Sequence, residues 1–251
     1  MDADPLISVR DLVQKIGPQE ILRGFSLDIF KGETLVLLGK SGGGKSVFLR
    51  HLIGLMKPVS GEILFEGRDI GGLNERELVP IRRKIGMLFQ DGALFDSMTV
   101  YDNVAFPLRE HGEKDEKSVR NKVHEALERV NMTGNDKKMP VNLSGGMRKR
   151  VALARAIISP PQVILYDEPT AGLDPIVSDS INRLIRRLQQ QLSVTSIVVT
   201  HDMISCYKIA DRVALLNEGR RHFYGTLGDL RDTGDEIVRD FVDGRSEDGE
   251  D

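Results

Sequence analysis

The sequence predicts an α/β fold built around a mostly parallel β-sheet. Two short apolar runs, Val163–Tyr166 and Val194–Val199, are of the kind that is buried inside a parallel sheet. A helical pattern over Ile176–Gln191 separates these two runs. Because buried strands alternate with helices, we expect a sheet with helices packed against its faces.

Strands dominate the first part of the chain and return near its end. From Lys45 onward, apolar residues recur at helical spacing, which predicts a helix that ends before Pro58. A short helix is expected after His201, and Gly17-Pro18 marks a turn between the first two strands. The strands expected are Leu6–Val13, Phe25–Phe30, Thr34–Gly39, Ile63–Phe65, Ile85–Phe89 and a hairpin of Val213–Leu216 with His222–Tyr224.

The middle of the chain is mostly helical. Residues 115–131 carry apolar side chains on one face, and a second helix is expected from about Gly145 to Ile158. Phe106-Pro107 is expected to end or kink a local helix. We expect residues 1–244 to form a single domain, in which approximately residues 91–160 are an inserted helical subdomain.

Composition and charge narrow the class of protein. The 251 residues include 35 Lys and Arg against 38 Asp and Glu, a net charge of −3, which does not favour a nucleic-acid binder. Asp235–Asp251 holds eight acidic and two basic residues, so this end carries −6 and the rest +3. We expect residues 245–251 to be an acidic, disordered tail.

We find no apolar segment in the sequence that is long enough to span a membrane, and no secretory signal. Its longest apolar runs, such as Leu35–Leu38, have four residues, whereas a membrane-spanning helix needs about 20. Met1–Pro5 has no features of a secretory signal. One cysteine, Cys206, excludes an internal disulfide framework. We therefore expect a cytoplasmic protein.

A glycine-rich loop predicts a phosphate site. Gly39–Ser46 matches G-x-x-x-x-G-K-[ST] between an expected strand and an expected helix. The glycines let backbone N–H groups point inward, and the helix adds its positive end. Lys45 can reach the β- and γ-phosphates, and Ser46 can ligate Mg²⁺. The nucleotide-binding set is Gly39, Lys40, Ser41, Gly42, Gly43, Gly44, Lys45, Ser46 and Val47.

Two further segments carry chemistry. The buried run Val163–Tyr166 leads into Asp167 and Glu168, at the strand end where α/β sheets bind ligands. Asp167 is expected in the Mg²⁺ shell, and Glu168 is expected to polarise the attacking water. Ser144 is a natural N-cap, and the glycines after it, Gly145 and Gly146, let backbone N–H groups approach an anion.

Taken in order, these segments resemble the ATP-binding subunit of an ABC transporter. The resemblance spans roughly residues 6–230 and implies a P-loop NTPase of the ABC-ATPase fold: a mostly parallel core sheet, an antiparallel β subdomain and the inserted helical subdomain. It implies hydrolysis of ATP to ADP and phosphate, coupled to transport. The set consists of Gly39–Ser46, Gln90, Leu143–Met147, Asp167-Glu168, Gly172-Leu173-Asp174 and His201.

By this resemblance, two copies of the chain form a homodimer that sandwiches two ATP molecules head to tail. Ser144–Gly146 of one copy would face the γ-phosphate held by the other. Gln90 would touch Mg²⁺ or the attacking water, and Asp174 would lie at the dimer interface. His201 would contact the γ-phosphate and hold the water and Glu168 in place.

One position departs from the family pattern. Many of these subunits stack an aromatic ring on adenine, and by register that position is Ile16 here. Isoleucine can pack against the base but offers no π-face. Ile16 is therefore expected to contact the base, while adenine specificity stays open.

The segment Met87–Glu110 is very similar to the ATPases of Mla/MCE-type phospholipid transporters, and Met147 and Val238–Gly244 agree with this. The resemblance implies a peripheral subunit at the cytoplasmic face of a bacterial inner membrane, with integral-membrane permease subunits and an MCE-type lipid-binding subunit. It leaves room for a small regulatory subunit. The apolar residues Leu94, Phe95, Met98, Val100 and Phe106 are expected to line a groove for a permease helix, although some of them would instead belong to the core of the helical subdomain.

Two other classes of ABC ATPase stay open. An importer ATPase for amino acids or another small solute would share every catalytic residue, and only Gly92–Glu110 and the tail discriminate against it. A soluble ABC ATPase that acts on ribosomes or DNA is the remote alternative. Such proteins resemble this one less, because they carry two nucleotide domains, long coiled coils or zinc modules, and we expect no nucleic-acid partner.

Overall fold

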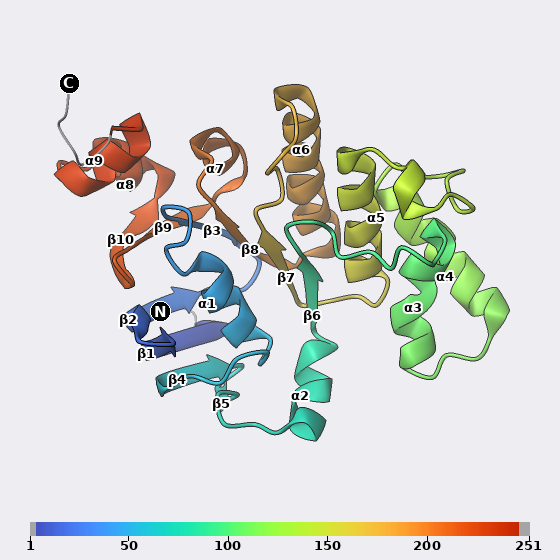
Figure 1. Ribbon diagram of the computed structural model, residues 1–251, viewed down its shortest axis with the longest axis horizontal. Coiled ribbons are helices and arrows are strands. Elements are labelled where there is room, and N and C mark those ends of the chain that lie inside the picture. Colours follow the sequence, from blue (N-terminus) through green and yellow to red (C-terminus); the bar gives the residue numbers. More distant parts are fainter. Residues whose placement is uncertain (1–3, 246–251) are drawn as a thin grey trace. The chain divides into compact units, whose positions relative to one another are not determined.

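The computed structural model describes residues 4–245 (Figure 1). The chain divides into two compact units: the first runs up to Leu78 and resumes at Ile197, and the second is Val79–Ser196. Two elements cross this division, α2 (Glu75–Arg82) and β8 (Thr195–Thr200). Residues 246–251, where most of the predicted acidic tail falls, lie outside the described residues.

An antiparallel sheet makes up much of the first unit. Its strand order is β2-β1-β4-β5, from β1 (Ile7–Ile16), β2 (Gln19–Ile29), β4 (Ser60–Phe65) and β5 (Arg68–Asp69). The turn predicted at Gly17-Pro18 joins β1 to β2. β2 starts six residues earlier than predicted, because its polar beginning pairs with the end of β1, with Gln19 opposite Ile16.

The other strands of the first unit bring the glycine-rich loop into place. β3 (Thr34–Leu38) is fully buried and pairs in parallel with β9 (Arg212–Asn217), which forms the predicted hairpin with β10 (Arg220–Thr226). The loop leads from β3 into α1 (Lys45–Leu52). The rings of Phe25 and Phe48 meet edge to face at 5.1 Å, which holds α1 against β2. The remaining helices of this unit are α7 (Met203–Ile209), α8 (Leu227–Asp232) and α9 (Glu236–Asp243).

The second unit combines a parallel strand pair with a group of helices. β6 (Ile85–Leu88) and β7 (Val163–Asp167) pair in parallel. The helices α3 (Val100–Glu110), α4 (Glu116–Arg129) and α5 (Gly145–Ile157) pack on one another, and α5 also packs on β6 and α6 (Pro175–Leu192). The 3₁₀ turn Pro140–Asn142 precedes α5. A Cβ at Gly86 would lie 2.4 Å from the Ala156 carbonyl oxygen, so glycine permits the approach of β6 to α5.

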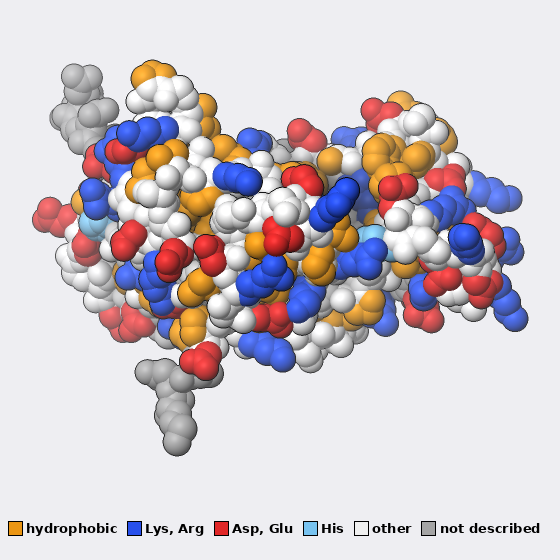
Figure 2. Space-filling view, turned by 90° about the horizontal axis from the view of Figure 1, so that it is seen from below, with side chains coloured by type: hydrophobic (Ala, Val, Ile, Leu, Met, Phe, Trp, Pro, Cys, Tyr) orange, Lys and Arg blue, Asp and Glu red, His pale blue; other side chains and the backbone are white. Residues whose placement is uncertain are grey.

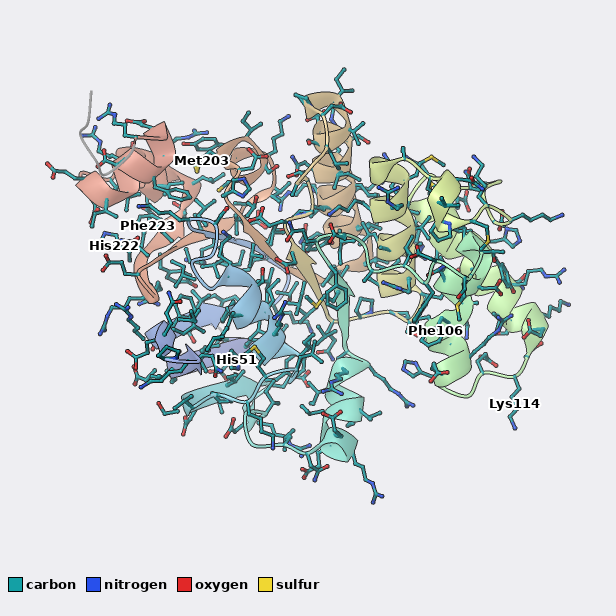
Figure 3. The ribbon with its side chains drawn as sticks, in the orientation of Figure 1. His51, Phe106, Lys114, Met203, His222 and Phe223 are labelled. Atoms are coloured by element: carbon teal, nitrogen blue, oxygen red, sulfur yellow. The ribbon has the colours of Figure 1, made fainter. Side chains whose placement is uncertain are left out.

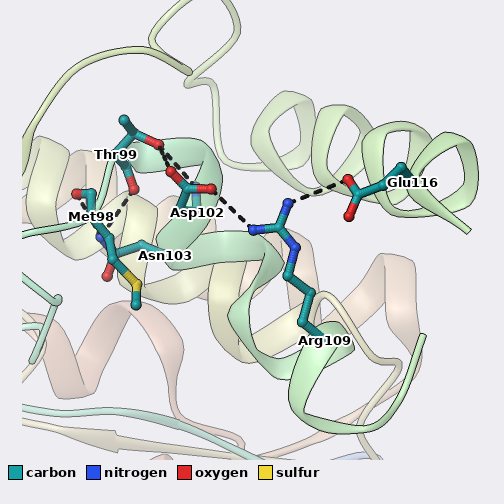
Figure 4. Close-up of polar contacts among 6 residues, drawn as sticks. All are labelled: Met98, Thr99, Asp102, Asn103, Arg109 and Glu116. Atoms are coloured by element: carbon teal, nitrogen blue, oxygen red, sulfur yellow. Dashed lines mark hydrogen bonds and ion pairs between the residues drawn. The ribbon is translucent and has the colours of Figure 1, made fainter. Parts of the chain in front are cut away.

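Helix α3 is the element that the sequence patterns describe least well. The sequence predicts an end or a kink at Pro107; the helix does not end there, because it continues three residues further to Glu110. Local contacts outweigh the proline (Figure 4). The Thr99 hydroxyl caps the helix by accepting from Asp102 N–H at 3.1 Å, and Arg109 bridges Asp102 to Glu116 of α4.

The observed elements agree with the predicted fold class. Parallel strand pairs occur in both units, β3 with β9 and β6 with β7, and the first unit carries a separate antiparallel sheet. Among residues 4–245, no helix is long and apolar enough to span a membrane.

Candidate functional site

The glycine-rich loop in the first unit owes its shape to two glycines with positive φ. Gly42 has φ 75° and Gly44, the N-cap of α1, has φ 102°. A Cβ at Gly44 would lie 2.9 Å from Cγ2 of Ile21, so neighbouring strand β2 leaves no room for a side chain. The N-cap of α1 is a glycine and no acidic residue lies in its first turn, so the positive end of the helix dipole lies at the loop without a neighbouring carboxylate in that turn. The arrangement suits a phosphate group.

Lys45 lies over this loop. The side chain is buried, and Nζ donates to the carbonyl oxygens of Gly39 at 2.7 Å and Lys40 at 3.1 Å. An ammonium held there by its own loop is positioned to donate charge-assisted hydrogen bonds to phosphate oxygens. Ser46 and Val47 follow in the first turn of α1, both half-buried.

His201 lies in the first unit, directly after β8. Asp202 next to it caps α7 and accepts from Ile204 N–H at 2.9 Å, which fixes the chain on the C-terminal side of the histidine. His201 and Lys40 line a common cavity of about 270 Å³, together with Leu216 of β9 and residues of α9. The structure thus brings His201 to the phosphate loop within this unit.

Ile16, predicted to contact the base, ends β1 next to the turn at Gly17. The residue is 49% exposed, which is ordinary for a single apolar residue on a protein surface. Its position is therefore available for an apolar ligand contact.

The paired carboxylates lie in the second unit. Asp167 is the last residue of β7, and Glu168 follows it; both are buried, at 7% and 8% exposure. Glu168 has φ 44°, which is rare for a residue other than glycine. The Glu168 carbonyl accepts from Ala171 N–H at 3.2 Å, closing a turn. Strained backbone of this kind clusters at functional sites.

Gln90 follows β6 in a loop that helix α5 holds by two basic side chains. Lys149 Nζ donates to the Gln90 carbonyl oxygen and, at 3.3 Å, to the Glu168 carbonyl oxygen. Arg155 donates to the carbonyl oxygens of Gly92 at 2.9 Å and Ala93 at 2.8 Å. Within this unit, the loop of Gln90 and the turn of Glu168 are therefore joined through one side chain. No pattern in the sequence pointed to Lys149 or Arg155.

Ser144 caps α5 as predicted, accepting from Met147 N–H at 3.3 Å. The two glycines after it have a packing role that the sequence did not reveal. A Cβ at Gly146 would lie 2.5 Å from Cγ1 of Val177 on α6, and one at Gly145 would lie 3.0 Å from Leu173. The small residues let α5 and α6 start close together.

Asp174 is exposed and caps α6. Its Oδ1 accepts from the N–H groups of Ile176 and Val177 at 3.0 Å each. The carboxylate therefore fixes the start of the helix that packs against Gly146. This capping role was not predicted, although Asp-Pro at a helix start is a recognisable signal.

A groove of about 400 Å³ opens beside the loop of Gln90 in the second unit. Phe95 and Phe106 line it, as predicted, with their rings 4.7 Å apart; Figure 3 labels Phe106 on α3. Val100 is instead fully buried, so it belongs to the core, which was the alternative expected for some of these side chains. Leu94 and Met98 do not line this groove either. Its other lining is apolar and basic, from Arg82, Arg83, Ile85, Gly86, Met87, Phe89, Ala93, Pro107, His111, Arg155, Ala156, Ile158, Ser159 and Pro161.

Buried Asn103 shapes the loop that carries Phe95. Its side chain accepts from Phe95 N–H at 2.8 Å and donates to the Phe95 carbonyl oxygen at 3.1 Å. It also donates to the carbonyl oxygens of Met98 and Thr99 at 3.1 and 3.0 Å (Figure 4). One amide thus satisfies four backbone groups, and the position of Phe95 at the groove follows from it.

Comparisons with known proteins agree on the family. The sequence profile described as "ABC transporter" matches residues 22–171. The chain is 45% identical to the "Probable ribonucleotide transport ATP-binding protein mkl" of Mycobacterium leprae, over 95% of this chain and 69% of that protein. It is 43% identical to the "Intermembrane phospholipid transport system ATP-binding protein MlaF" of Haemophilus influenzae, over 96% and 92%. It is 43% identical to the "Methionine import ATP-binding protein MetN" of Rhizobium johnstonii, over 87% and 60%.

Solved structures show the same fold. The dimeric ATP-binding cassette MJ0796 in a post-hydrolysis state, bound to ADP and Pi, matches with a TM-score of 0.80 and 31% identity, over 88% of this chain and 98% of that one. The predicted fold class and the predicted resemblance are therefore confirmed. On this evidence the chain belongs to the ABC transporter family, as an ATP-binding subunit that hydrolyses ATP to drive transport.

Proposed function

We propose that this subunit powers phospholipid transport, in a complex of the Mla/MCE type at the cytoplasmic face of a bacterial inner membrane. One observation carries the choice of substrate: the match to the intermembrane phospholipid transport ATPase runs end to end on both chains, over 96% of this one and 92% of the other. The matched ribonucleotide and methionine transport proteins extend well beyond the aligned part.

The phosphates of ATP bind to the loop Gly39–Ser46 and to Lys45 in this proposal. The support is the geometry of the first unit, where the uncapped start of α1 and the buried ammonium converge on one loop. His201 contacts the γ-phosphate, and Ile16 packs against the base. Ser144–Gly146 and Asp174 contact the nucleotide or the loop of a second copy, so that two copies of the chain complete two sites.

Magnesium fits the donors that the chain offers. Mg²⁺ prefers oxygen ligands and is commonly held by one or two side chains plus substrate phosphates. Ser46, at the start of α1, Asp167, at the end of β7, and the amide of Gln90 are oxygen donors of this kind. Residues 4–245 contain no cluster of three or more His, Cys, Asp or Glu that would form a closed protein cage. The bound ion would neutralise charge on the phosphates.

Glu168 acts as the general base in this proposal. Its carboxylate accepts a proton from the attacking water as the oxygen of that water bonds to the γ-phosphorus, and the bond from this phosphorus to the β–γ bridging oxygen breaks. His201 and Gln90 orient the water. The products are ADP and phosphate, and their release lets the two copies separate.

The groove beside Gln90 receives a short cytoplasmic helix of the permease. Phe95 and Phe106 supply the apolar floor, and the basic side chains of Arg83 and Arg155 lie around it. Because Arg155 also holds the Gln90 loop, movement of the groove and of the loop go together. Binding and hydrolysis of ATP in the subunit thereby change the conformation of the permease in the membrane. An MCE-type lipid-binding subunit and a small regulatory subunit complete the complex.

An importer of a small solute such as methionine is the second candidate, favoured by the 43% identity to the methionine import protein. A role on nucleic acid has less support. On the face shown in Figure 2, Lys and Arg side chains lie intermixed with Asp and Glu rather than in one basic patch.

Purification of the tagged full chain from its own membranes tests this proposal. We expect an integral permease and a lipid-binding subunit to co-purify, with phospholipid bound to the complex. Recovery of a solute-binding protein, with ATPase activity stimulated by that solute, would contradict the phospholipid assignment. The matched variant Phe95→Asp should lose the permease while keeping ATP binding, because it places a charge in the apolar groove.

A further inference from the structure

Lys149 is a buried lysine with no part in the proposed chemistry. It lies on α5, five residues after Ser144, and its residue surface is only 5% exposed. Burial lowers the pKa of this ammonium, while the nearby carboxylates of Asp91, Asp167 and Glu168 act to raise it. A buried charge is costly unless it is well bonded, so its contacts indicate a role.

Those contacts join two separate parts of the candidate site. Lys149 Nζ donates to the carbonyl oxygen of Gln90, 59 residues away in sequence, and at 3.3 Å to that of Glu168, 19 residues away. Both acceptors are backbone atoms. The ammonium therefore fixes main-chain positions from which the Gln90 and Glu168 side chains extend.

The backbone at each acceptor is a tight turn. Gly92 N–H donates to the Phe89 carbonyl at 2.9 Å across Gln90, and Glu168 is held at φ 44°. A left-handed conformation at a residue other than glycine costs about 1–2 kcal/mol and persists only where its surroundings enforce it. The bond from Lys149 to the Glu168 carbonyl is one such constraint.

We propose that Lys149 is a positioning residue for ATP hydrolysis, which ties the backbone of Gln90 to that of Glu168 through one ammonium. The inference rests on the proposed roles of Gln90 and Glu168. Arg155 differs from it, because its acceptors, Gly92 and Ala93, lie further along the same loop and Arg155 itself lines the groove. Two cations of helix α5 thus hold the loop that begins at Gln90. Lys149 ties Gln90 to the turn of Glu168, and Arg155 holds the residues that follow.

Steady-state ATPase kinetics of the full chain, in the complex with which it purifies, test this role. In Lys149→Met we expect kcat to fall about 10-fold or more, because small misplacements of catalytic groups are costly, while KM for ATP changes less than about twofold. The matched control is Lys114→Met; Lys114 is an exposed lysine in the loop before α4 (Figure 3), and its replacement should leave both constants unchanged.

Two further variants separate positioning from folding. Lys149→Gln keeps a buried hydrogen-bond donor but cannot span both carbonyls, so kcat should fall while the melting temperature stays close to wild type. In a Gln90→Ala background the effect of Lys149→Met on kcat should be smaller than in the wild type, because only Glu168 is left to be positioned.

The outcomes are distinct. If Lys149→Gln is folded and its kcat is within about twofold of wild type, or if Lys149→Met and Gln90→Ala act independently, the positioning role is wrong. If Glu168→Gln, assayed beside them, hydrolyses ATP at the wild-type rate, the proposed catalytic site itself is wrong.

Discussion

The effect of Gly146→Ala on stability should depend on the side chain of Val177 in α6. The substitution should destabilise the chain when Val177 is present and stabilise it when Val177 is replaced by alanine. The added Cβ would lie 2.5 Å from Cγ1 of Val177, about 1 Å closer than carbon atoms normally approach. Val177 is β-branched in a helix and has one strongly preferred rotamer, so it cannot easily turn away.

The magnitude follows from two opposing terms. Overpacking of this kind costs about 1–3 kcal/mol, whereas alanine gains about 1 kcal/mol over glycine inside a helix. Gly146→Ala alone should therefore destabilise the chain by up to about 2 kcal/mol. With Val177→Ala present, the nearest remaining atom is the Cβ of residue 177 at 3.9 Å, an ordinary contact. There Gly146→Ala should stabilise by about 1 kcal/mol.

Urea unfolding of the four variants in this cycle measures the coupling, which should be about 1–3 kcal/mol. An equal effect of Gly146→Ala in both backgrounds would refute the packing argument. The ATPase activity of the same four variants tests whether Gly146 is needed for packing alone. Because the added methyl points at α6, the double variant should recover ATPase activity together with stability. If stability returns and activity does not, the added methyl obstructs the contact with the nucleotide that is proposed for Ser144–Gly146.

Three other predictions concern separate parts of the chain. Lys45→Met should weaken ATP binding about 10- to 100-fold in a titration, because it removes charge-assisted bonds to phosphate, and an unchanged affinity would refute its placement. Asn103→Leu should lower the free energy of unfolding by about 2 kcal/mol or more, since it leaves Phe95 N–H without its partner; a smaller loss in urea unfolding would contradict this. The Thr99 hydroxyl, and then Arg109, lower the pKa of Asp102, so its stabilisation is present above the unfolded value of 3.8 and lost as pH falls through the lower folded value. Melting temperatures from about pH 6 to about pH 3 should therefore fall less steeply in Asp102→Asn, and parallel curves would contradict the stabilising bonds of the Asp102 carboxylate to Thr99 and Arg109.

The elements and site residues that could be predicted from the sequence are those that show a pattern in consecutive or nearby residues. Gly39–Ser46 shows its chemistry in consecutive residues, and Ser144 shows a cap by its type and place. Strand runs such as Val163–Tyr166 are visible because burial on both faces requires continuous apolar residues. These features led to the fold class and to the family, and both are confirmed.

The rest depends on contacts between residues far apart in sequence. In the sequence, Lys149 resembles any basic residue on a helix surface. Only the fold shows that its side chain donates a hydrogen bond to the Gln90 carbonyl oxygen, 59 residues away in sequence. Val100 reads as a groove residue, but packing among the helices buries it fully. Pro107 lies inside α3 because Asn103, Asp102 and Arg109 stabilise the helix locally, which outweighs the preference of proline.

Transport of labelled phospholipid by the purified complex in vesicles tests the central claim most directly. With wild-type chain and Mg-ATP, we expect phospholipid transfer that stops when Glu168→Gln replaces the wild type, although the variant still binds ATP. Loss of the general base should cut turnover about 100-fold or more. Phospholipid transfer at the same rate with Glu168→Gln, or ATP-driven movement of a small solute in its place, would contradict the account.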